Sequence, residues 1–269
     1  MRIAIDHVVV NVRAELDEAQ HRWEALGFRL TPRGHHSLGS SNHLAVFADD
    51  YIELLGIEPG RTATRRELID HPLGLTGLAL KPEDDGVADT LRRAGVAMGE
   101  AREFHRPVEL PGGAAPEARF RTAEVVDSRV RNGRIFFCHH YTPELVWRDE
   151  WRGHPNGALG LDEFVFRSKD PAGLAELFSR MGGAPEQVAG GYVVPAGPAR
   201  ISVLSPEAVT DRLGAAAPGG TEDRMVALGI RVRDVAAAAR MGGVEVANGT
   251  ALVPHATACG VALAYVGGG

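Results

Sequence analysis

Short apolar segments with strand character divide this chain, and longer segments with apolar residues at helical spacing lie between them. Residues 3–12 form a β-branched run that predicts a strand. Residues 14–26 place apolar side chains on one helical face, and Gly27 follows where a glycine commonly ends a helix. Three more short strands are predicted at residues 28–30, 43–47 and 51–57. The first unit is therefore strand–helix–strand–strand–strand.

The same order of elements can be followed along the rest of the chain. A second unit has a strand at residues 75–80, a helix at 84–94 and strands at 120–126 and 135–141. The third and fourth units begin with strands at residues 161–166 and 225–232. Glycines that end the four helices are expected at Gly27, Gly95, Gly182 and Gly242.

An internal repeat supports this division. The sequence Arg-Met-Gly-Gly at residues 180–183 recurs at residues 240–243. Val-Val-Pro at residues 193–195 corresponds to Leu-Val-Pro at residues 252–254. Both recurrences follow an alanine-rich helical segment at nearly the same spacing, which indicates a duplicated unit. The sequence thus predicts an α+β protein built from four βαβββ modules.

Two polar, turn-rich segments suggest how the modules are grouped. Residues 148–160 are expected to join two halves, and residues 205–223 form a second connection inside the C-terminal half. We therefore expect a module pair at residues 1–147, a linker at residues 148–160 and a second module pair at residues 161–269.

Composition narrows the class of protein. The chain has 269 residues, 44% hydrophobic and 24% charged, with a net charge of −6 and a pI near 6.0. These values are typical of a soluble globular protein and give no reason to expect nucleic acid or membrane as a partner. Two cysteines, Cys138 and Cys259, are too few for a disulfide framework. No signal peptide or membrane span is visible, so a cytoplasmic location is expected.

Histidines point to chemistry in the first half. Ten of the eleven lie between His7 and His154. Either this concentration is chance on a histidine-rich surface, or it marks a site that uses metal-binding or proton-transferring side chains. Common hydrolase, nucleotide-binding and zinc-protease motifs are absent from the sequence.

Two segments of the sequence resemble a known protein family. Residues 5–10 (Ile-Asp-His-Val-Val-Val), followed by a helix and then by residues 50–55 (Asp-Tyr-Ile-Glu-Leu-Leu), resemble the opening module of the vicinal-oxygen-chelate superfamily, which includes glyoxalases, bleomycin-resistance proteins and extradiol dioxygenases. Residues 41–43, 136–137 and 154–158 are similar to bacterial glyoxalase-like domain proteins. The resemblance implies modules paired 1–2 and 3–4 into two curved, mostly antiparallel mixed sheets, with a divalent metal on a concave face.

The resemblance also implies two metal ligands, His7 in the first strand and Glu53 in the fourth. Alternation places His7 on one face with Ile3, Ile5 and Val9. A glutamate inside an apolar run is costly to bury unless it is paired or bound to a cation, although Glu53 could also lie on a half-exposed strand.

The second module is expected to supply the remaining ligand. Gly77 or Thr76 stands where the family would place a ligand in its first strand. Its last strand contains His139 and His140, of which one can face the cleft, and we select His139. The set His7, Glu53 and His139 would suit Fe(II), Zn(II), Mn(II) or Ni(II).

Other histidines offer acid–base chemistry. His36 and His43 flank a loop expected at the mouth of the cleft, and we select both as candidate catalytic residues. Substrate binding or a merely solvated position are the alternatives. In the C-terminal half, Glu163 occupies the position of His7, and Ser202 replaces Glu53. That half is therefore expected to have a structural or dimerising role.

Two functions remain open from the sequence. The first is a metal-dependent lyase, isomerase or dioxygenase that acts on a small substrate chelating the metal through vicinal oxygens. The second is a metal-free protein that binds or sequesters a small molecule. The expected partners are a small-molecule substrate and, as one option, a second copy of the chain.

Overall fold

The computed structural model describes residues 2–36, 39–58, 60, 65–110 and 113–268. Its first half contains two βαβββ modules. The first comprises β1 (Ile5–Arg13), α1 (Leu16–Ala25), β2 (Gly34–His35), β3 (Ser40–Val46) and β4 (Tyr51–Ile57). The short α2 (Glu67–Asp70) leads to the second, which comprises β5 (Gly74–Leu80), α3 (Val87–Arg93), β6 (Arg102–Pro107), β7 (Glu117–Glu124) and β8 (Arg134–His140).

The second half repeats this order. Its third module comprises β9 (Ala158–Arg167), α4 (Pro171–Arg180), β10 (Glu186–Val188), β11 (Gly191–Ala196) and β12 (Ala199–Leu204). After α5 (Pro206–Leu213), the fourth comprises β13 (Arg224–Val232), α6 (Val235–Gly242), β14 (Val246–Ala247), β15 (Thr250–Val253) and β16 (Ala262–Gly267). Short 3-10 helices lie at Pro143–Leu145, Asp149–Trp151 and Gly214–Ala216.

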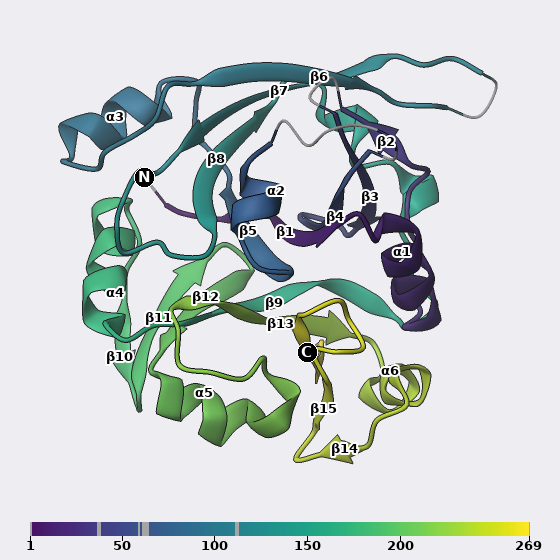
Figure 1. Ribbon diagram of the computed structural model, residues 1–269, viewed down its shortest axis with the longest axis vertical. Helices are drawn as coiled ribbons and strands as arrows, with labels where there is room; N and C mark the ends of the chain where they lie inside the picture. Colours follow the sequence, from purple (N-terminus) through teal and green to yellow (C-terminus); the bar gives the residue numbers. More distant parts are fainter. Residues whose placement is uncertain (1, 37–38, 59, 61–64, 111–112, 269) are drawn as a thin grey trace.

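The modules pair within two eight-stranded mixed sheets. Their strand orders are β2-β3-β4-β1-β5-β8-β7-β6 and β10-β11-β12-β9-β13-β16-β15-β14 among the described residues. In each module the first strand is parallel to the last, and the first strands of paired modules are antiparallel. The predicted α+β fold with module pairs 1–2 and 3–4 is confirmed (Figure 1).

Several boundaries differ from the expected ones. No strand forms at residues 28–30, and the short β2 follows instead. β9 begins at Ala158, inside the segment expected as a linker. The last helix is closed by Gly243, with a φ of 64°, rather than by Gly242, which remains helical. A left-handed φ costs glycine little because it has no Cβ.

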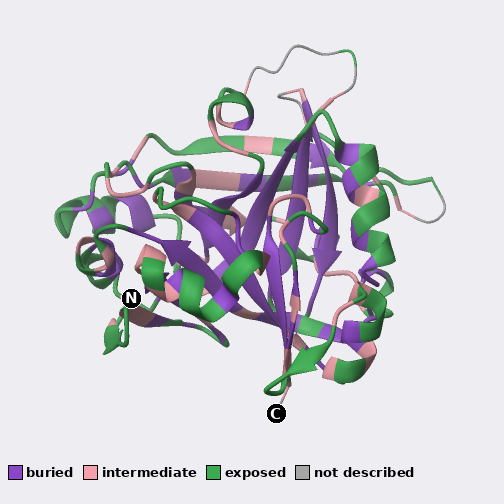
Figure 2. Ribbon diagram, turned by 60° about the horizontal axis from the view of Figure 1, so that its bottom comes forward, coloured by how far each residue is buried: buried purple, intermediate pink, exposed green. Residues whose placement is uncertain are grey.

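The two sheets lie one above the other and share one hydrophobic core (Figure 1). Val8 and Leu78 from the first sheet belong to the same buried cluster as Phe164 and Leu228 from the second. The strands fill the interior, whereas the helices expose much of their surface (Figure 2). Because the inner faces pack together, the opposite face of each sheet is left to form a separate site.

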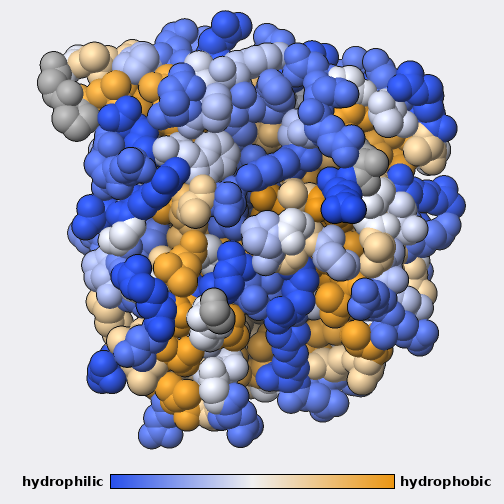
Figure 3. All heavy atoms as spheres, turned by 180° about the vertical axis from the view of Figure 1, so that it is seen from behind, coloured by the Kyte–Doolittle hydropathy of each residue, from blue (hydrophilic) through white to orange (hydrophobic). Residues whose placement is uncertain are grey.

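The outer faces of the two sheets are covered differently. Smaller apolar clusters lie on each, one around Val9 and Phe136 and one around Val165 and Val226. α5 packs on the second face through Val209 and Leu213 and covers part of it. On the side seen in Figure 3, hydrophilic residues separate the apolar surface into narrow strips. Among the described residues, no helix is both long and apolar enough to span a membrane.

Candidate functional site

A bulge in β1 brings two adjacent side chains to the outer face of the first sheet. Ile5 pairs with Leu80 and His7 pairs with Ala79, so Asp6 is the extra residue in the pairing of β1 with β5. Ile5 and Val8 belong to the shared core, whereas His7 lines a cavity on the opposite face. The expectation that His7 shares a face with Ile3 and Ile5 is therefore wrong, because the bulge interrupts the alternation.

Asp6 lies at the centre of a buried polar cluster. Its Oδ1 accepts hydrogen bonds from His7 Nδ1 at 2.6 Å and from His140 Nε2 at 2.9 Å. Burial raises the pKa of Asp6, but the charge and hydrogen bonds of His140 and His7 hold it well below its usual range. Cys138 Sγ lies 3.7 Å from His140 Nε2. The ligand atoms of Asp6, His7, Cys138 and His140 all lie within 4.8 Å of one another.

In β8, the last strand of the second module, the side chains on the cavity side of the sheet are not the predicted ones. Cys138 lies on the cavity wall, and His140, two residues on, contacts Asp6. His139 points to the other side of the sheet, with its Nε2 3.5 Å from Asp85 Oδ1. The selection of His139 as the histidine that faces the cleft is corrected to His140, because the register is shifted by one residue.

Glu53 belongs to a second polar group on the cavity wall. Its Oε1 accepts a hydrogen bond from Asn42 Nδ2 at 2.7 Å and lies 4.0 Å from His36 Nε2. Burial raises the pKa of Glu53, but the neighbouring imidazoles of His36 and His7 and the Asn42 hydrogen bond lower it below its usual value. Glu53 pairs with Val9 rather than His7 in the parallel register of β4 and β1.

His36 is held in a neutral form beside Glu53. Burial lowers its pKa to about 4. Its Nδ1 lies 2.8 Å from Ser40 Oγ, and its Nε2 lies 3.3 Å from Asn42 Nδ2. An amide nitrogen only donates, so Nε2 accepts and the proton of the neutral ring is assigned to Nδ1. His36 and the ionised Glu53 are therefore two proton acceptors on one wall.

The other predicted catalytic histidine lies elsewhere. His43 is buried, and its Nδ1 lies 2.8 Å from the carbonyl oxygen of Thr31. Its neighbours Asn42 and Leu44 line the cavity, so alternation along β3 turns His43 to the core side of the sheet. The structure brings His7, Glu53 and His36 to one cavity and leaves His43 and His139 outside it.

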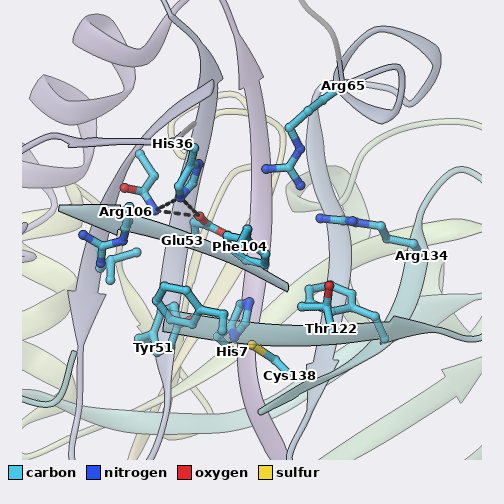
Figure 4. Close-up of a pocket in the computed structure, with 14 residues that line it drawn as sticks. His7, His36, Tyr51, Glu53, Arg65, Phe104, Arg106, Thr122, Arg134 and Cys138 are labelled. Atoms are coloured by element: carbon cyan, nitrogen blue, oxygen red, sulfur yellow. Dashed lines mark hydrogen bonds and ion pairs between the residues drawn. The ribbon is translucent and has the colours of Figure 1, made fainter. Parts of the chain in front are cut away.

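The cavity encloses about 510 Å³ of empty space, open solvent at its mouth included. This volume suits a small organic molecule. Figure 4 shows His7 and Cys138 on one side and His36 with Glu53 on another. Its remaining lining consists of aromatic, aliphatic and cationic residues with one amide and two hydroxyl groups: Asn42, Leu44, Tyr51, Arg65, Phe104, Arg106, Phe120, Thr122, Arg134 and Phe136.

Sequence reasoning missed several residues of this site, among them Asp6, Asn42, Arg106 and Cys138. Asp6 was passed over because regular alternation would turn it away from His7. Asn42 was noticed only as part of the family pattern, and Arg106 lies in β6, a strand that was not predicted. The adjacent Asp-His pair could have indicated Asp6, because carboxylates commonly orient histidines through the second ring nitrogen.

At the equivalent position in the second half, protein groups occupy the place of the first cavity's polar cluster, although Glu163, Ser202 and Arg212 still line a surface pocket. Glu163 follows the same kind of bulge in β9 and is buried. Its carboxylate binds Arg212 from α5 and Ser202 from β12, and Arg200 lies within 3.4 Å. Burial raises the pKa of Glu163, but Arg212, Ser202 and Arg200 lower it below its usual value. Protein groups therefore satisfy this carboxylate completely.

Comparison with known proteins agrees with the fold. The model of a family described as glyoxalase-like domain matches residues 5–182. A search of the curated proteins gave no match. Among solved structures, a hypothetical protein from Staphylococcus aureus is similar with a TM-score of 0.70 and 12% identity, covering 98% of this chain and 99% of that one.

Two further structures share the fold. A mutant of 4-hydroxymandelate synthase from Streptomyces coelicolor has a TM-score of 0.52 and 16% identity, over 90% of this chain and 76% of that one. A xylose isomerase-like TIM barrel/4-hydroxyphenylpyruvate dioxygenase fusion protein has a TM-score of 0.54 and 17% identity, and the match covers 90% of this chain but 39% of the fusion. At such identities the similarity concerns the fold alone.

Proposed function

Because the chain belongs to the glyoxalase-like domain family of the vicinal-oxygen-chelate superfamily, we propose that it is a divalent-metal-dependent enzyme that acts on a small substrate chelating the metal through two vicinal oxygens. The observation that carries this proposal is the convergence of four donor atoms, from Asp6, His7, Cys138 and His140, at the wall of this cavity. One carboxylate, two imidazoles and a thiol fit Zn(II) or Fe(II), which accept mixed oxygen, nitrogen and sulfur ligands.

The donor set lies where a bound substrate would meet it. His7 and Cys138 line the cavity, while Asp6 and His140 lie behind them and are buried or nearly so. The Nδ1 atom of His140 is buried without a hydrogen-bond partner among the described residues. A divalent cation at this place would act as a Lewis acid toward substrate oxygens.

The opposite wall supplies the proton-transfer chemistry. Glu53 is ionised, and Asn42 fixes its Oε1 while the described residues offer Oε2 no hydrogen bond. Oε2 is therefore the atom that takes a proton from the substrate. The neutral ring of His36 lies next to this carboxylate and can accept that proton in turn. Such proton transfer supports a lyase or isomerase more than a dioxygenase.

Elemental analysis of purified protein tests the proposal. We expect one equivalent of metal in the wild type, or after incubation with Fe(II), Zn(II), Mn(II) or Ni(II). Cys138→Ser should lose most of the metal, whereas Glu53→Ala should keep it because Glu53 lies outside the four-donor cluster. If Glu53→Ala loses the metal and Cys138→Ser keeps it, the ion lies between His7 and Glu53 instead.

A metal-free binding protein is the second candidate. The observation in its favour is that Asp6 already accepts two hydrogen bonds, from His7 and His140, so the cluster is satisfied without a cation. The same measurement separates the two functions. A wild-type protein that binds none of the four metals would support small-molecule binding and exclude the metal-dependent enzyme.

A further inference from the structure

Arg106 is a buried cation on the cavity wall. Its side chain extends from β6 into the lining, and the residue is 5% exposed. Among the described residues, no ion pair or hydrogen bond satisfies its guanidinium, and the undescribed positions contain no aspartate or glutamate. Burial lowers the pKa of Arg106. The charge of Glu53 offsets part of this shift, but a buried guanidinium without a hydrogen-bond acceptor remains costly.

Two more guanidinium groups line the same cavity. Arg65 and Arg134 point into it from the side opposite His36 and Glu53 (Figure 4). Both form ion pairs with the same carboxylate oxygen, Oε1 of Glu67. Arg65 Nε lies 2.8 Å from it and Arg134 Nη1 lies 3.6 Å from it. Among the residues that line the cavity, three arginines therefore accompany one carboxylate, that of Glu53, while Glu67 and Asp6 lie behind the lining.

Aromatic rings complete the lining beside Arg106. Phe104 and Phe120 are stacked, with their ring centroids 5.1 Å apart, and Phe104 is two residues from Arg106 along β6. Phe136 also lines the cavity, and the guanidinium carbon of Arg134 lies 4.5 Å from the centroid of its ring. Such surfaces bind flat apolar groups, while the arginines bind anions, often through two parallel hydrogen bonds.

We infer that the substrate of this cavity is a small anion, with a carboxylate or phosphate group bound by Arg106 and an apolar, preferably aromatic, body lying against Phe104 and Phe120. This inference rests on the proposed function, because it names the substrate class of the same cavity. It adds to that function a specificity determinant, Arg106, that contributes no atom to the four-donor cluster.

Binding of three probes tests it directly. Benzoate, phenyl phosphate and neutral benzamide are titrated calorimetrically into metal-loaded and chelator-treated protein. We expect one or both anions to bind about tenfold or more tightly than benzamide in both preparations, since charge-assisted hydrogen bonds contribute this much. The comparison of benzoate with phenyl phosphate distinguishes a carboxylate from a phosphate site.

Substitutions assign the preference to Arg106. Arg106→Met should remove the preference for anions while metal content stays unchanged, and Arg106→Lys should restore part of it. Arg119→Met, at an exposed position of β7, is the matched control and should behave as the wild type. The inference is overturned if benzamide binds as tightly as the anions, if no anion binds, or if Arg106→Met keeps the preference.

The two proposals fail separately. A wild-type protein that takes up no metal but still prefers anions contradicts the metal-dependent enzyme and leaves the anion site standing. An anion preference that appears only with metal and survives Arg106→Met shows that the anion binds the cation. That result contradicts the role of Arg106 and leaves the metal site standing.

Discussion

The carboxylate oxygen Oδ1 of Asp6 lies 2.6 Å from Nδ1 of His7, although the two residues are neighbours in one strand. In a regular strand their side chains would point to opposite faces of the sheet. The bulge in β1 turns both to the outer face, and the hydrogen bond fixes Nδ1 of His7 inside the cluster. The imidazole ring of His7 also stacks on the ring of Tyr51, with centroids 4.4 Å apart. The hydrogen bond and the stacking together fix the orientation of the imidazole.

Asp6→Asn tests this arrangement. The amide keeps the shape of the side chain but cannot give both imidazoles a charged acceptor, so we expect the free energy of unfolding to fall by about 1–3 kcal/mol. We also expect metal retention to fall, because one donor and the orientation of His7 are lost together. Urea unfolding and elemental analysis measure the two effects. Wild-type metal content in Asp6→Asn would contradict the role given to Asp6.

The adjacent histidines of β8 give a matched pair of variants. His140→Ala should lose the metal, because His140 contributes a donor atom to the cluster. His139→Ala should retain it, because His139 lies on the other face of the sheet beside Asp85. Elemental analysis of both variants, with circular dichroism to confirm folding, decides between them. Loss of metal in His139→Ala alone would restore the register predicted from the sequence.

The fold was predictable because its signals repeat. Four modules each contribute a helix that ends at a glycine, and the two C-terminal modules even share the residues at 180–183 and 240–243. Such signals identify the modules even when the predicted bounds of helices and strands are wrong by a few residues. The strand missed at β6 is mostly exposed or half-buried and contains three charged residues, so it lacks the apolar pattern on which strand prediction depends.

The site was less predictable because its geometry depends on single-residue shifts. A bulge of one residue placed Asp6 in the cluster and moved His7 away from the face of Ile5. A register difference of one residue exchanged His139 and His140. Strand alternation has a period of two, so any such shift exchanges the inside and the outside. Apart from the adjacent Asp-His pair, the pattern of residues contains no signal that fixes these shifts.

The buried carboxyl group of Asp50 is expected to make the stability of the protein depend on pH. It is buried, its Oδ1 accepts a hydrogen bond from Leu161 N across the two halves, and burial raises its pKa to about 7. The folded protein therefore holds the proton more tightly than the unfolded chain, and stability is lost as the pH rises from about 4 through 7. Asp50→Asn removes this loss.

We expect the stability of Asp50→Asn relative to the wild type to increase by roughly 1–3 kcal/mol between pH 5 and pH 8. Urea unfolding at both values measures it. Asp49→Asn, at the exposed neighbouring position, is the control and should follow the wild type at both pH values. A difference between Asp50→Asn and the wild type that does not change with pH would show that Asp50 is ionised throughout.

Glu163→Gln tests the contrast between the two halves. Glu163 stands at the position equivalent to His7, but Arg212 and Ser202 bind its carboxylate and α5 covers part of its face of the sheet. The variant should therefore keep the wild-type metal content. Its free energy of unfolding should fall by about 1–3 kcal/mol, because Arg212 loses a charged partner that is itself buried. Arg212 is 40% exposed, so water partly compensates and the lower part of this range is expected. Loss of metal from Glu163→Gln would place a metal site in the second half and contradict the assignment of the cluster around Asp6.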